Sequence, residues 1–290
     1  MNVGIVAQKG NTRATALAEE LREQLSAVDA SVTLDEATGR SLGLDGRPVE
    51  TLGDCDLIVS IGGDGTFLFA ASGADGTPIL GVNLGEVGFL NAVGPDDAVE
   101  AVLAEVAAVR DGDQRVRVVP RLVAVGDGWR SDPATNEIVV QGGRRGRGGG
   151  VDLEVRLDGS LYTSGHADGL LVSTPTGSTA YNLSERGPLV HPSVGGLVVN
   201  EMCPDEGMPP LLVAPDATVT VTVNAVGGWG ASGGRLGNDD GTTDDAVVVS
   251  DGKHSYPVEP PTEVEIRRAE TPLRIAGPSS DFFEALNKLD

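Results

Sequence analysis

The chain has 290 residues, of which 40% are hydrophobic, and it carries a formal net charge of -22 at pH 7. This length and apolar content predict a globular protein of one large or two ordinary domains. The excess of acidic residues would repel a phosphate backbone, so nucleic acid is excluded as a general partner. No apolar stretch reaches the ~18 residues of a membrane-spanning helix, so we expect no membrane partner either.

The scarcity of lysine and cysteine indicates where the protein works. Lysine stands only at positions 9, 253 and 288, whereas the chain has 43 Asp and Glu residues. Such acidity is typical of halophilic proteins, because the screening length falls to about 3 Å near 1 M salt. An ordinary acidic cytosolic protein is the alternative. Two cysteines are too few for a disulfide framework and the N-terminus does not resemble a signal peptide, so we expect a cytoplasmic protein.

The first part of the chain alternates strand and helix patterns. Residues 3–7, 57–61 and 79–82 are apolar runs that predict buried parallel strands. Apolar residues at helical spacing predict a helix after the first run, where Asn11 or Thr12 can cap it, and another helix over residues 96–110. The alternation predicts a parallel sheet covered by helices, over residues 1–113.

Helical patterns give way to strand patterns near residue 115. The segments that read as strands are 116–119, 121–125, 137–141, 151–157, 170–173 and 219–223, and Asp158-Gly159 is typical of a hairpin turn. We therefore predict a β-rich second domain over residues 114–266. The pattern of residues 281–289 is helical with one apolar side, so residues 267–290 are predicted to return to the first domain or to a partner subunit.

The segment that says most about function is the Gly-Gly-Asp-Gly-Thr turn at residues 62–66, directly after the strand predicted at 57–61. Glycines let backbone N–H groups approach phosphate oxygens closely, because no Cβ intervenes. The single carboxylate, Asp64, is placed to polarise a hydroxyl or to help hold a phosphate-bound magnesium. The turn therefore indicates phosphoryl transfer from a nucleotide, although no GxxxxGK[ST] P-loop is present. A cap for the next helix is the alternative role of Asp64.

Two further segments are compatible with a nucleotide site. In Asn83–Leu90, glycines suit a turn near a ligand and Phe89 offers an aromatic face; a plain turn with a core Phe is the alternative. In Asp168–Ser184, an apolar strand ends in hydroxyls, Pro and Gly, which offer donors to an anion. The small Ala180 leaves room for a flat base there, and Tyr181 can stack on one.

Together these three motifs resemble those of the NAD kinase family, enzymes that phosphorylate NAD on the 2′-hydroxyl of its adenosine ribose. Asn136-Glu137, before an apolar strand, and Ser250-Asp251-Gly252 resemble the family too. The resemblance covers residues 3–289. It implies a Rossmann-like α/β domain and a β-rich, sandwich-like domain with the active site between them. It also implies ATP or another donor such as polyphosphate, Mg²⁺ or another divalent cation held mainly through nucleotide phosphates, and a homodimer or homotetramer.

The resemblance assigns a role to each matching residue. Asp64 would be the base that takes the proton of the ribose hydroxyl. The nucleotide phosphates would be bound by Gly62, Gly63 and Thr66. The NAD-binding residues would be Gly65, Phe89, Asn136, Glu137, Asp168, Thr176, Thr179, Ala180, Tyr181, Asn182, Leu183 and Ser184. Arg147, His166 and Lys253 are further basic candidates, each with an ordinary surface role as its alternative, and no dedicated metal ligand is predicted.

One segment departs from the family pattern. After Cys203-Pro204 the family carries a His and then an Arg before Pro, whereas this chain reads Asp205-Glu206-Gly207-Met208-Pro209-Pro210. An alternative function is therefore a non-catalytic or weakly active NAD- or NADP-binding paralogue, that is, a sensor. A lipid or sugar kinase that shares only the Gly-Gly-Asp-Gly turn is a third alternative, against which the hydroxyl-rich segment 176–184 argues.

Overall fold

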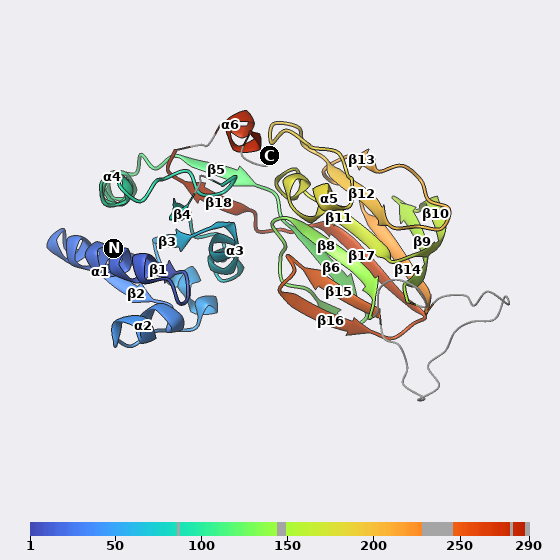
Figure 1. Ribbon diagram of the computed structural model, residues 1–290, viewed down its shortest axis with the longest axis horizontal. Helices are drawn as coiled ribbons and strands as arrows, with labels where there is room; N and C mark the ends of the chain where they lie inside the picture. Colours follow the sequence, from blue (N-terminus) through green and yellow to red (C-terminus); the bar gives the residue numbers. More distant parts are fainter. Residues whose placement is uncertain (86–87, 144–148, 228–245, 279–280, 288–290) are drawn as a thin grey trace. The chain divides into compact units, whose positions relative to one another are not determined.

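The computed structural model describes residues 1–85, 88–143, 149–227, 246–278 and 281–287. By its internal contacts the chain divides into two compact units, Met1–Val119 with Thr271–Asp290, and Pro120–Glu270. Figure 1 labels most elements of both units. Within the described ranges, no helix is both long and apolar enough to cross a membrane.

The first unit is a six-stranded sheet with helices on both faces. Its strand order is β2-β1-β3-β4-β18-β5, and β5 alone runs antiparallel, beside β18. The strands are β1 (Asn2–Ala7), β2 (Ser31–Leu34), β3 (Leu57–Gly62), β4 (Ile79–Asn83), β5 (Val116–Val119) and β18 (Leu273–Ala276). The helices are α1 (Thr12–Ala27), α2 (Glu36–Leu42), the 3-10 helix η1 (Val49–Asp54), α3 (Asp64–Ser72), α4 (Ala98–Asp111) and α6 (Phe282–Leu286).

Alternating side chains of the parallel strands supply a core on each face of this sheet. Val3 and Ile5 of β1 pack in one core with buried residues of α1 and α4, whereas Val6 packs in the other with α3 and η1. Helix α1 begins as predicted, because the Asn11 side chain accepts hydrogen bonds from the N–H groups of Arg13 and Ala14. The sheet thus presents the carboxyl ends of β1, β3 and β4 side by side.

The boundaries of the units differ from the predicted ones at residues 113 and 266. The strand at 116–119 was predicted for the second domain, but it is β5 and pairs with β18 in the first sheet. The second boundary lies after Glu270, because β17 (Thr262–Arg268) belongs to the second unit. Both shifts come from pairing between strands far apart in the chain, which local patterns do not contain.

The second unit is a sandwich of two six-stranded antiparallel sheets. Their orders are β10-β9-β14-β17-β6-β7 and β13-β12-β11-β8-β15-β16. The strands are β6 (Leu122–Gly126), β7 (Trp129–Arg130), β8 (Glu137–Gly142), β9 (Val151–Leu157), β10 (Ser160–Ala167), β11 (Gly169–Ser173), β12 (Leu197–Met202), β13 (Leu211–Val213), β14 (Val219–Val226), β15 (Ala246–Ser250), β16 (His254–Val258) and β17. Two short helical segments, η2 (Thr176–Thr179) and α5 (Tyr181–Ser184), follow β11.

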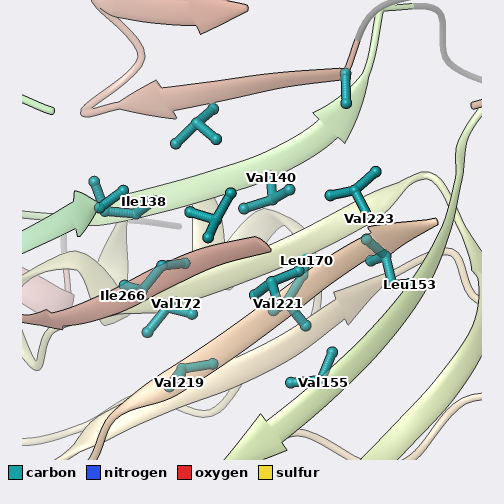
Figure 2. Close-up of a cluster of buried hydrophobic side chains, with 14 of the residues drawn as sticks. Ile138, Val140, Leu153, Val155, Leu170, Val172, Val219, Val221, Val223 and Ile266 are labelled. Carbon is teal, nitrogen blue, oxygen red and sulfur yellow. The ribbon is translucent and has the colours of Figure 1, made fainter. Parts of the chain in front are cut away.

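The core of the second unit lies between its two sheets. Figure 2 shows Ile138 and Val140 of β8 facing side chains such as Val221 and Ile266 of the other sheet. The hairpin between β9 and β10 turns at Asp158 and Gly159 with φ values of 47° and 83°, as the Asp-Gly pair predicts. The predicted fold class is confirmed: a parallel-sheet α/β unit, a β-rich sandwich-like unit, and a C-terminal helix that belongs to the first unit.

Candidate active site

The first two motifs lie together at the carboxyl edge of the parallel sheet. The Gly-Gly-Asp-Gly-Thr turn follows β3, and the Asn83–Leu90 segment follows β4, with Gly62 directly opposite Asn83 in the pairing of these strands. The end of β1 is tied to the same place, because the N–H of Gln8 donates to the carbonyl of Ile61 at 2.8 Å. In open α/β sheets, ligands bind at this edge.

Asp64 is oriented by the segment that follows β4. Its carboxylate accepts a hydrogen bond from Nδ2 of Asn91 at 2.9 Å, and from the backbone N–H groups of Phe89 and Leu90. Burial raises the pKa of Asp64, and these three donors oppose the rise. Asp64 is the first residue of α3, yet its recorded partners all lie in residues 89–91, so the structure does not support the alternative role as a helix cap.

Two glycines allow this approach. A Cβ on Gly88 would lie 2.5 Å from Oδ1 of Asp64, and a Cβ on Gly81 would collide with the side chain of Asn91. Asn91 is fully buried, and its Oδ1 has no hydrogen-bond partner among the described residues. Asn91 was missed by the sequence analysis; its only signal is that it directly follows the recognised turn.

The glycines of the turn itself fall into two kinds. A Cβ on Gly62 would lie 2.5 Å from Oγ1 of Thr66 and 3.0 Å from Cβ of Gln8, so internal packing requires this glycine. A Cβ on Gly63 or Gly65 would meet nothing within 4 Å. Gly63 also has an ordinary φ of -95°. Neither contacts nor backbone geometry explain Gly63, and its bare backbone faces open space, as contact with a ligand phosphate requires.

Phe89 packs on the returning C-terminal helix. Its ring centroid lies 5.9 Å from that of Phe282 in α6, with the rings tilted by 54°. The residue as a whole is half-buried. The contact supports the alternative that Phe89 is a packing residue, for one side of its ring. The exposed remainder of the Phe89 side chain is the part that a ligand could contact.

In the second unit, Asp251 anchors the Asn136-Glu137 motif. Its carboxylate accepts backbone hydrogen bonds from Thr135 at 2.8 Å, Asn136 at 2.7 Å and Glu137 at 3.2 Å. Its own N–H donates to the carbonyl of Glu137 at 3.1 Å. Burial raises the pKa of Asp251, and the three N–H groups oppose the rise. Asp251 therefore holds the start of β8 against the end of β15.

Glu137 is the second buried acid of this cluster. Only 6% of the residue is exposed, and burial together with the neighbouring charge of Asp251 raises its pKa to about 8. The backbone N–H of Tyr181 donates to its carboxyl group, but Oε2 has no partner among the described residues. A ligand hydroxyl would supply the missing hydrogen bond.

The hydroxyl-rich turn after β11 packs on the same motif. The N–H of Thr174 donates to the carbonyl of Asn136 at 2.9 Å, and the Thr174 hydroxyl donates to the carbonyl of Thr135 at 2.6 Å. A Cβ on Gly177 would collide with the Asn136 carbonyl, so glycine is required there. Of the predicted NAD-binding residues in this turn, Thr176, Thr179, Ala180, Tyr181 and Leu183 are half-buried and Ser184 is exposed.

Asn182 has a structural task. It is fully buried, and its amide donates to the carbonyls of Ser178 at 3.3 Å and Pro188 at 3.0 Å. A side chain on Gly187 would collide with it. Asn182 therefore supports the turn from inside, whereas its half-buried neighbours Tyr181 and Leu183 contribute to the surface.

Comparisons with known proteins decide the family. The ATP-NAD kinase N-terminal domain matches residues 3–110, and the ATP-NAD kinase C-terminal domain matches residues 135–231. The chain is 58% identical to the NAD kinase of Halorubrum lacusprofundi and 56% identical to that of Halobacterium salinarum, with 100% of both chains covered in each case. The chain belongs to the NAD kinase family.

Solved structures of NAD kinases share this fold. The NAD kinase of Archaeoglobus fulgidus in complex with ATP matches with a TM-score of 0.75 at 25% identity, over 100% of this chain and 98% of that one. Yeast NADH kinase complexed with NADH matches with a TM-score of 0.79 at 21% identity, over 100% and 87% of the two chains. The family predicted from the three motifs is confirmed.

Not every residue singled out by the NAD kinase resemblance joins these clusters. Lys253 belongs to the Asp251 cluster, because the charge of Asp251 acts on it. Desolvation lowers the pKa of Lys253 to about 8, and the Asp251 charge opposes this change. Part of the residue is still exposed. Asp168 lies at the other end of β11 from Thr174, roughly 20 Å away along an extended strand. Arg147 lies outside the described residues.

His166 is held within the protein at the Asp168 end of β11. Its Nδ1 lies 2.8 Å from Oδ1 of Asp152, and its Nε2 lies 3.1 Å from the carbonyl of Gly149. The backbone carbonyl of His166 accepts a hydrogen bond from the N–H of Asp205 at 3.0 Å. The segment that departs from the NAD kinase pattern is therefore on the His166 side of this unit.

The departing segment is anchored rather than free. The N–H of Met208 donates to Oε2 of Glu201 at 2.9 Å, and the Tyr162 hydroxyl donates to the carbonyl of Pro209 at 2.5 Å. Thr163 also donates to Oε1 of Glu201, at 3.3 Å. The segment takes a defined position without the cationic residues that the family pattern would place there.

Proposed function

We propose that this protein transfers the γ-phosphoryl group of ATP to the 2′-hydroxyl of the adenosine ribose of NAD and so makes NADP and ADP. The observation that carries the proposal is Asp64: a partly buried carboxylate, oriented by Asn91 and two backbone N–H groups, beside a glycine turn that is open to a ligand. Membership of the NAD kinase family supports the same activity.

In the proposed reaction, Asp64 acts as general base. The ribose 2′-oxygen forms a bond to the γ-phosphorus while its proton passes to the Asp64 carboxylate, and the bond from the γ-phosphorus to the β–γ bridging oxygen breaks to release ADP. The raised pKa of Asp64 brings it closer to working pH, which favours proton transfer. The ribose oxygen must lie about 2.6–3.2 Å from the carboxylate for this step.

The turn after β3 would bind the transferred phosphate. We assign phosphate contacts to the backbone of Gly63 and Gly65 and to the hydroxyl of Thr66, with Gly62 required for packing. No group of three or more His, Cys, Asp or Glu side chains in the described residues is arranged to hold a metal ion. Mg²⁺ would therefore be held mainly through the nucleotide phosphates, with Asp64 as a nearby carboxylate, and would offset phosphate charge.

In the second unit, Asn136 and Glu137 would bind ribose hydroxyls and the adenine region, and Thr176, Thr179, Ala180 and Tyr181 would form the adenine pocket. Asp168 would anchor the nicotinamide end, because NAD is an extended ligand with two separated rings. We further propose a homodimer or homotetramer in a cytoplasm of high salt. Light scattering in molar KCl tests the assembly, and a monomer would contradict it.

The decisive test is NADP formation by purified protein from NAD, ATP and Mg²⁺ in molar KCl, followed with an NADP-specific dehydrogenase. We expect NADP from the native protein and from the Asp111→Asn control, and almost none from Asp64→Asn. NAD binding without NADP, with ATP or with polyphosphate, would establish the sensor function instead. Phosphorylation of a lipid or a sugar but not of NAD would overturn the proposal.

A further inference from the structure

The first unit contains a cavity beside the proposed phosphate turn whose other lining residues have no role assigned so far. It has a volume of about 280 Å³ and is lined by the end of β1 and residues of α2 and α3, among them Ala7, Lys9, Ala37, Gly65, Thr66 and Phe69. Its boundary includes Gly65 and Thr66, so the cavity continues directly from the proposed phosphate turn. A larger cavity of about 600 Å³ lies along β2 and contains none of the predicted site residues.

The position of the small cavity is where open α/β sheets bind nucleotides. The order β2-β1-β3-β4 places β2 and β3 on opposite sides of β1, so the direction of chain progression reverses between β1 and β3. Ligands bind in the crevice outside the carboxyl ends of the strands at such a switch point. Ala7 is the last residue of β1 and Lys9 lies in the turn after it, and Gly65 and Phe69 belong to the helix after β3.

The walls of the cavity suit a flat aromatic group. Phe69 is 40% exposed although it is large and apolar, and it lines the cavity. Ala7 and Ala37, which also line the cavity, are small and leave room for a ring. An aromatic side chain stacks on any nucleic-acid base, because every base has a π-face. The volume is slightly below the usual range for a drug-sized ligand, ~300–1,000 Å³, so the cavity fits part of a nucleotide and not a whole dinucleotide.

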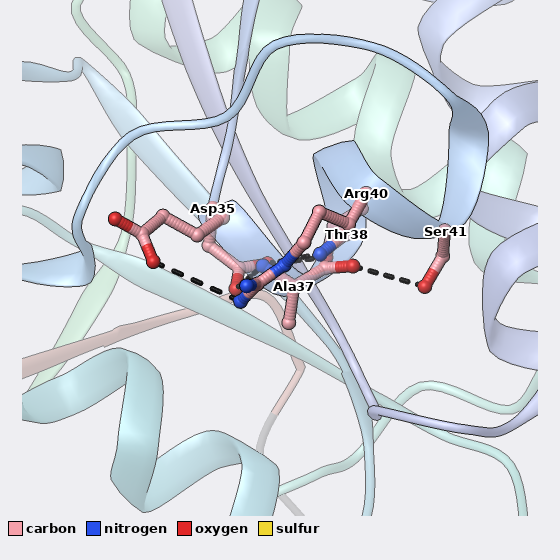
Figure 3. Close-up of polar contacts among 6 residues, drawn as sticks. Asp35, Ala37, Thr38, Arg40 and Ser41 are labelled. Atoms are coloured by element: carbon pink, nitrogen blue, oxygen red, sulfur yellow. Dashed lines mark hydrogen bonds and ion pairs between the residues drawn. The ribbon is translucent and has the colours of Figure 1, made fainter.

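The charge at the cavity favours phosphate. Lys9 is exposed and makes no ion pair with a described residue. The one carboxylate in the lining, Asp35, is only 2% exposed and is already used: it accepts the N–H groups of Ala37 at 2.9 Å and Thr38 at 3.2 Å, and also the Thr38 hydroxyl. Figure 3 draws these contacts at the start of α2. Lys9 is therefore available to an anion that enters the cavity.

The cavity is also formed before any ligand binds. Oγ1 of Thr38 accepts the backbone N–H of Ala7 at 2.8 Å while its hydroxyl donates to Asp35, which ties the end of β1 to α2. The N–H of Gln8, the residue after β1, donates to the carbonyl of Ile61 in β3. The end of β1 is thus fixed to both α2 and β3, which lowers the ordering cost of binding beside it.

We propose that this cavity binds the purine base of the nucleotide phosphate donor, with the base stacked on Phe69 and with Lys9 paired to the donor phosphates as they enter the Gly63–Thr66 turn. The proposal rests on the proposed kinase function and adds to it a preference for a nucleotide over inorganic polyphosphate. Both donors offer phosphate to Lys9, whereas only a nucleotide offers a base to Phe69.

The test compares two probes by calorimetry in molar KCl with Mg²⁺ and saturating NAD: a non-hydrolysable ATP analogue and inorganic tripolyphosphate. We expect Phe69→Ala to lower the affinity for the ATP analogue about tenfold and to leave the affinity for tripolyphosphate unchanged. Lys9→Met should lower the affinity for both probes. Phe69→Trp keeps an aromatic ring and should bind the ATP analogue as tightly as the native protein does. Leu44→Ala, which removes another exposed apolar side chain, and Arg40→Met, which removes another exposed cation, are the controls.

Each remaining outcome counts against the proposal. An unchanged affinity of Phe69→Ala for the ATP analogue would show that the base binds elsewhere. An equal loss for both probes would show that Phe69 supports the phosphate turn rather than the base, and thermal unfolding of each variant separates this from a loss of folding. Failure of the native protein to make NADP would overturn the kinase function, whereas the binding comparison is read independently of turnover.

Discussion

Asp64 in the first unit and Asp251 in the second are both carboxylates whose surroundings differ. In each, burial raises the pKa of the carboxyl group and hydrogen bonds oppose that rise. Asp251 accepts three successive backbone N–H groups and is used up in holding Asn136-Glu137 in place. Asp64 is held from one side by residues 89–91 and lies beside glycines that face open space. The comparison separates a carboxylate that builds a site from one that is presented to a ligand.

The largest expected effects distinguish these two residues: substitution of Asp64 should lower activity, and substitution of Asp251 should lower stability. Asp64→Asn removes the base and should lower kcat about 100- to 10,000-fold, while NAD affinity and thermal stability stay near native. Asp251→Ala leaves three backbone N–H groups without their acceptor and should lower the free energy of unfolding by about 3 kcal/mol and weaken NAD binding. Steady-state kinetics and denaturant unfolding measure both. Equal loss of stability in the two variants would contradict the distinction.

The next effect concerns the glycine that makes room for Asp64. In Gly88→Ala, the new Cβ would lie 2.5 Å from Oδ1 of Asp64, and the carboxylate, as the end of a side chain, must move. We expect kcat to fall about 10- to 100-fold with little change in melting temperature. Gly85→Ala is the matched control, because its nearest atom would be 4.0 Å away. Full activity of Gly88→Ala would argue against a precisely oriented carboxylate.

A smaller effect tests the second cluster through pH. The pKa of Glu137 is raised from 4.5 to about 8, so between these pH values the folded protein binds more protons at this site than the unfolded chain does. The contribution of Glu137 to stability is therefore fully present below pH 4.5 and is lost as pH rises toward 8. Glu137→Gln should flatten this part of the curve of unfolding free energy against pH. An unchanged slope in that variant would contradict the raised pKa.

The smallest effect concerns Asn91, which donates to Asp64 at 2.9 Å. Asn91→Leu removes a donor that opposes the raised pKa of Asp64, so the acidic limb of the kcat–pH profile should move to higher pH. Asn91→Thr keeps a hydroxyl donor and should move it less. A purely structural role would lower activity at every pH and leave the position of the limb unchanged.

Local pattern was sufficient for much of this molecule. The strand before the Gly-Gly-Asp-Gly-Thr turn, the cap of α1 at Asn11 and the Asp158-Gly159 hairpin each depend on neighbouring residues, and each was predicted. The same holds for the motifs that identified the family. Their residue types act through backbone geometry and close approach, which a short stretch of sequence records directly.

The tertiary structure decided what depends on distant segments meeting. Asp251 is more than a hundred positions from the N–H groups that it accepts, so its anchoring role had no local signal. The same is true of β18 and β5, which pair in the first sheet although the whole second unit lies between them in the chain. It is also true of Phe69 and Lys9, which line one cavity from different elements. The sequence by itself determined the turns and the chemistry that they carry. Only folding decided which side chains orient them, because orientation comes from contacts between strands that the chain order does not place together.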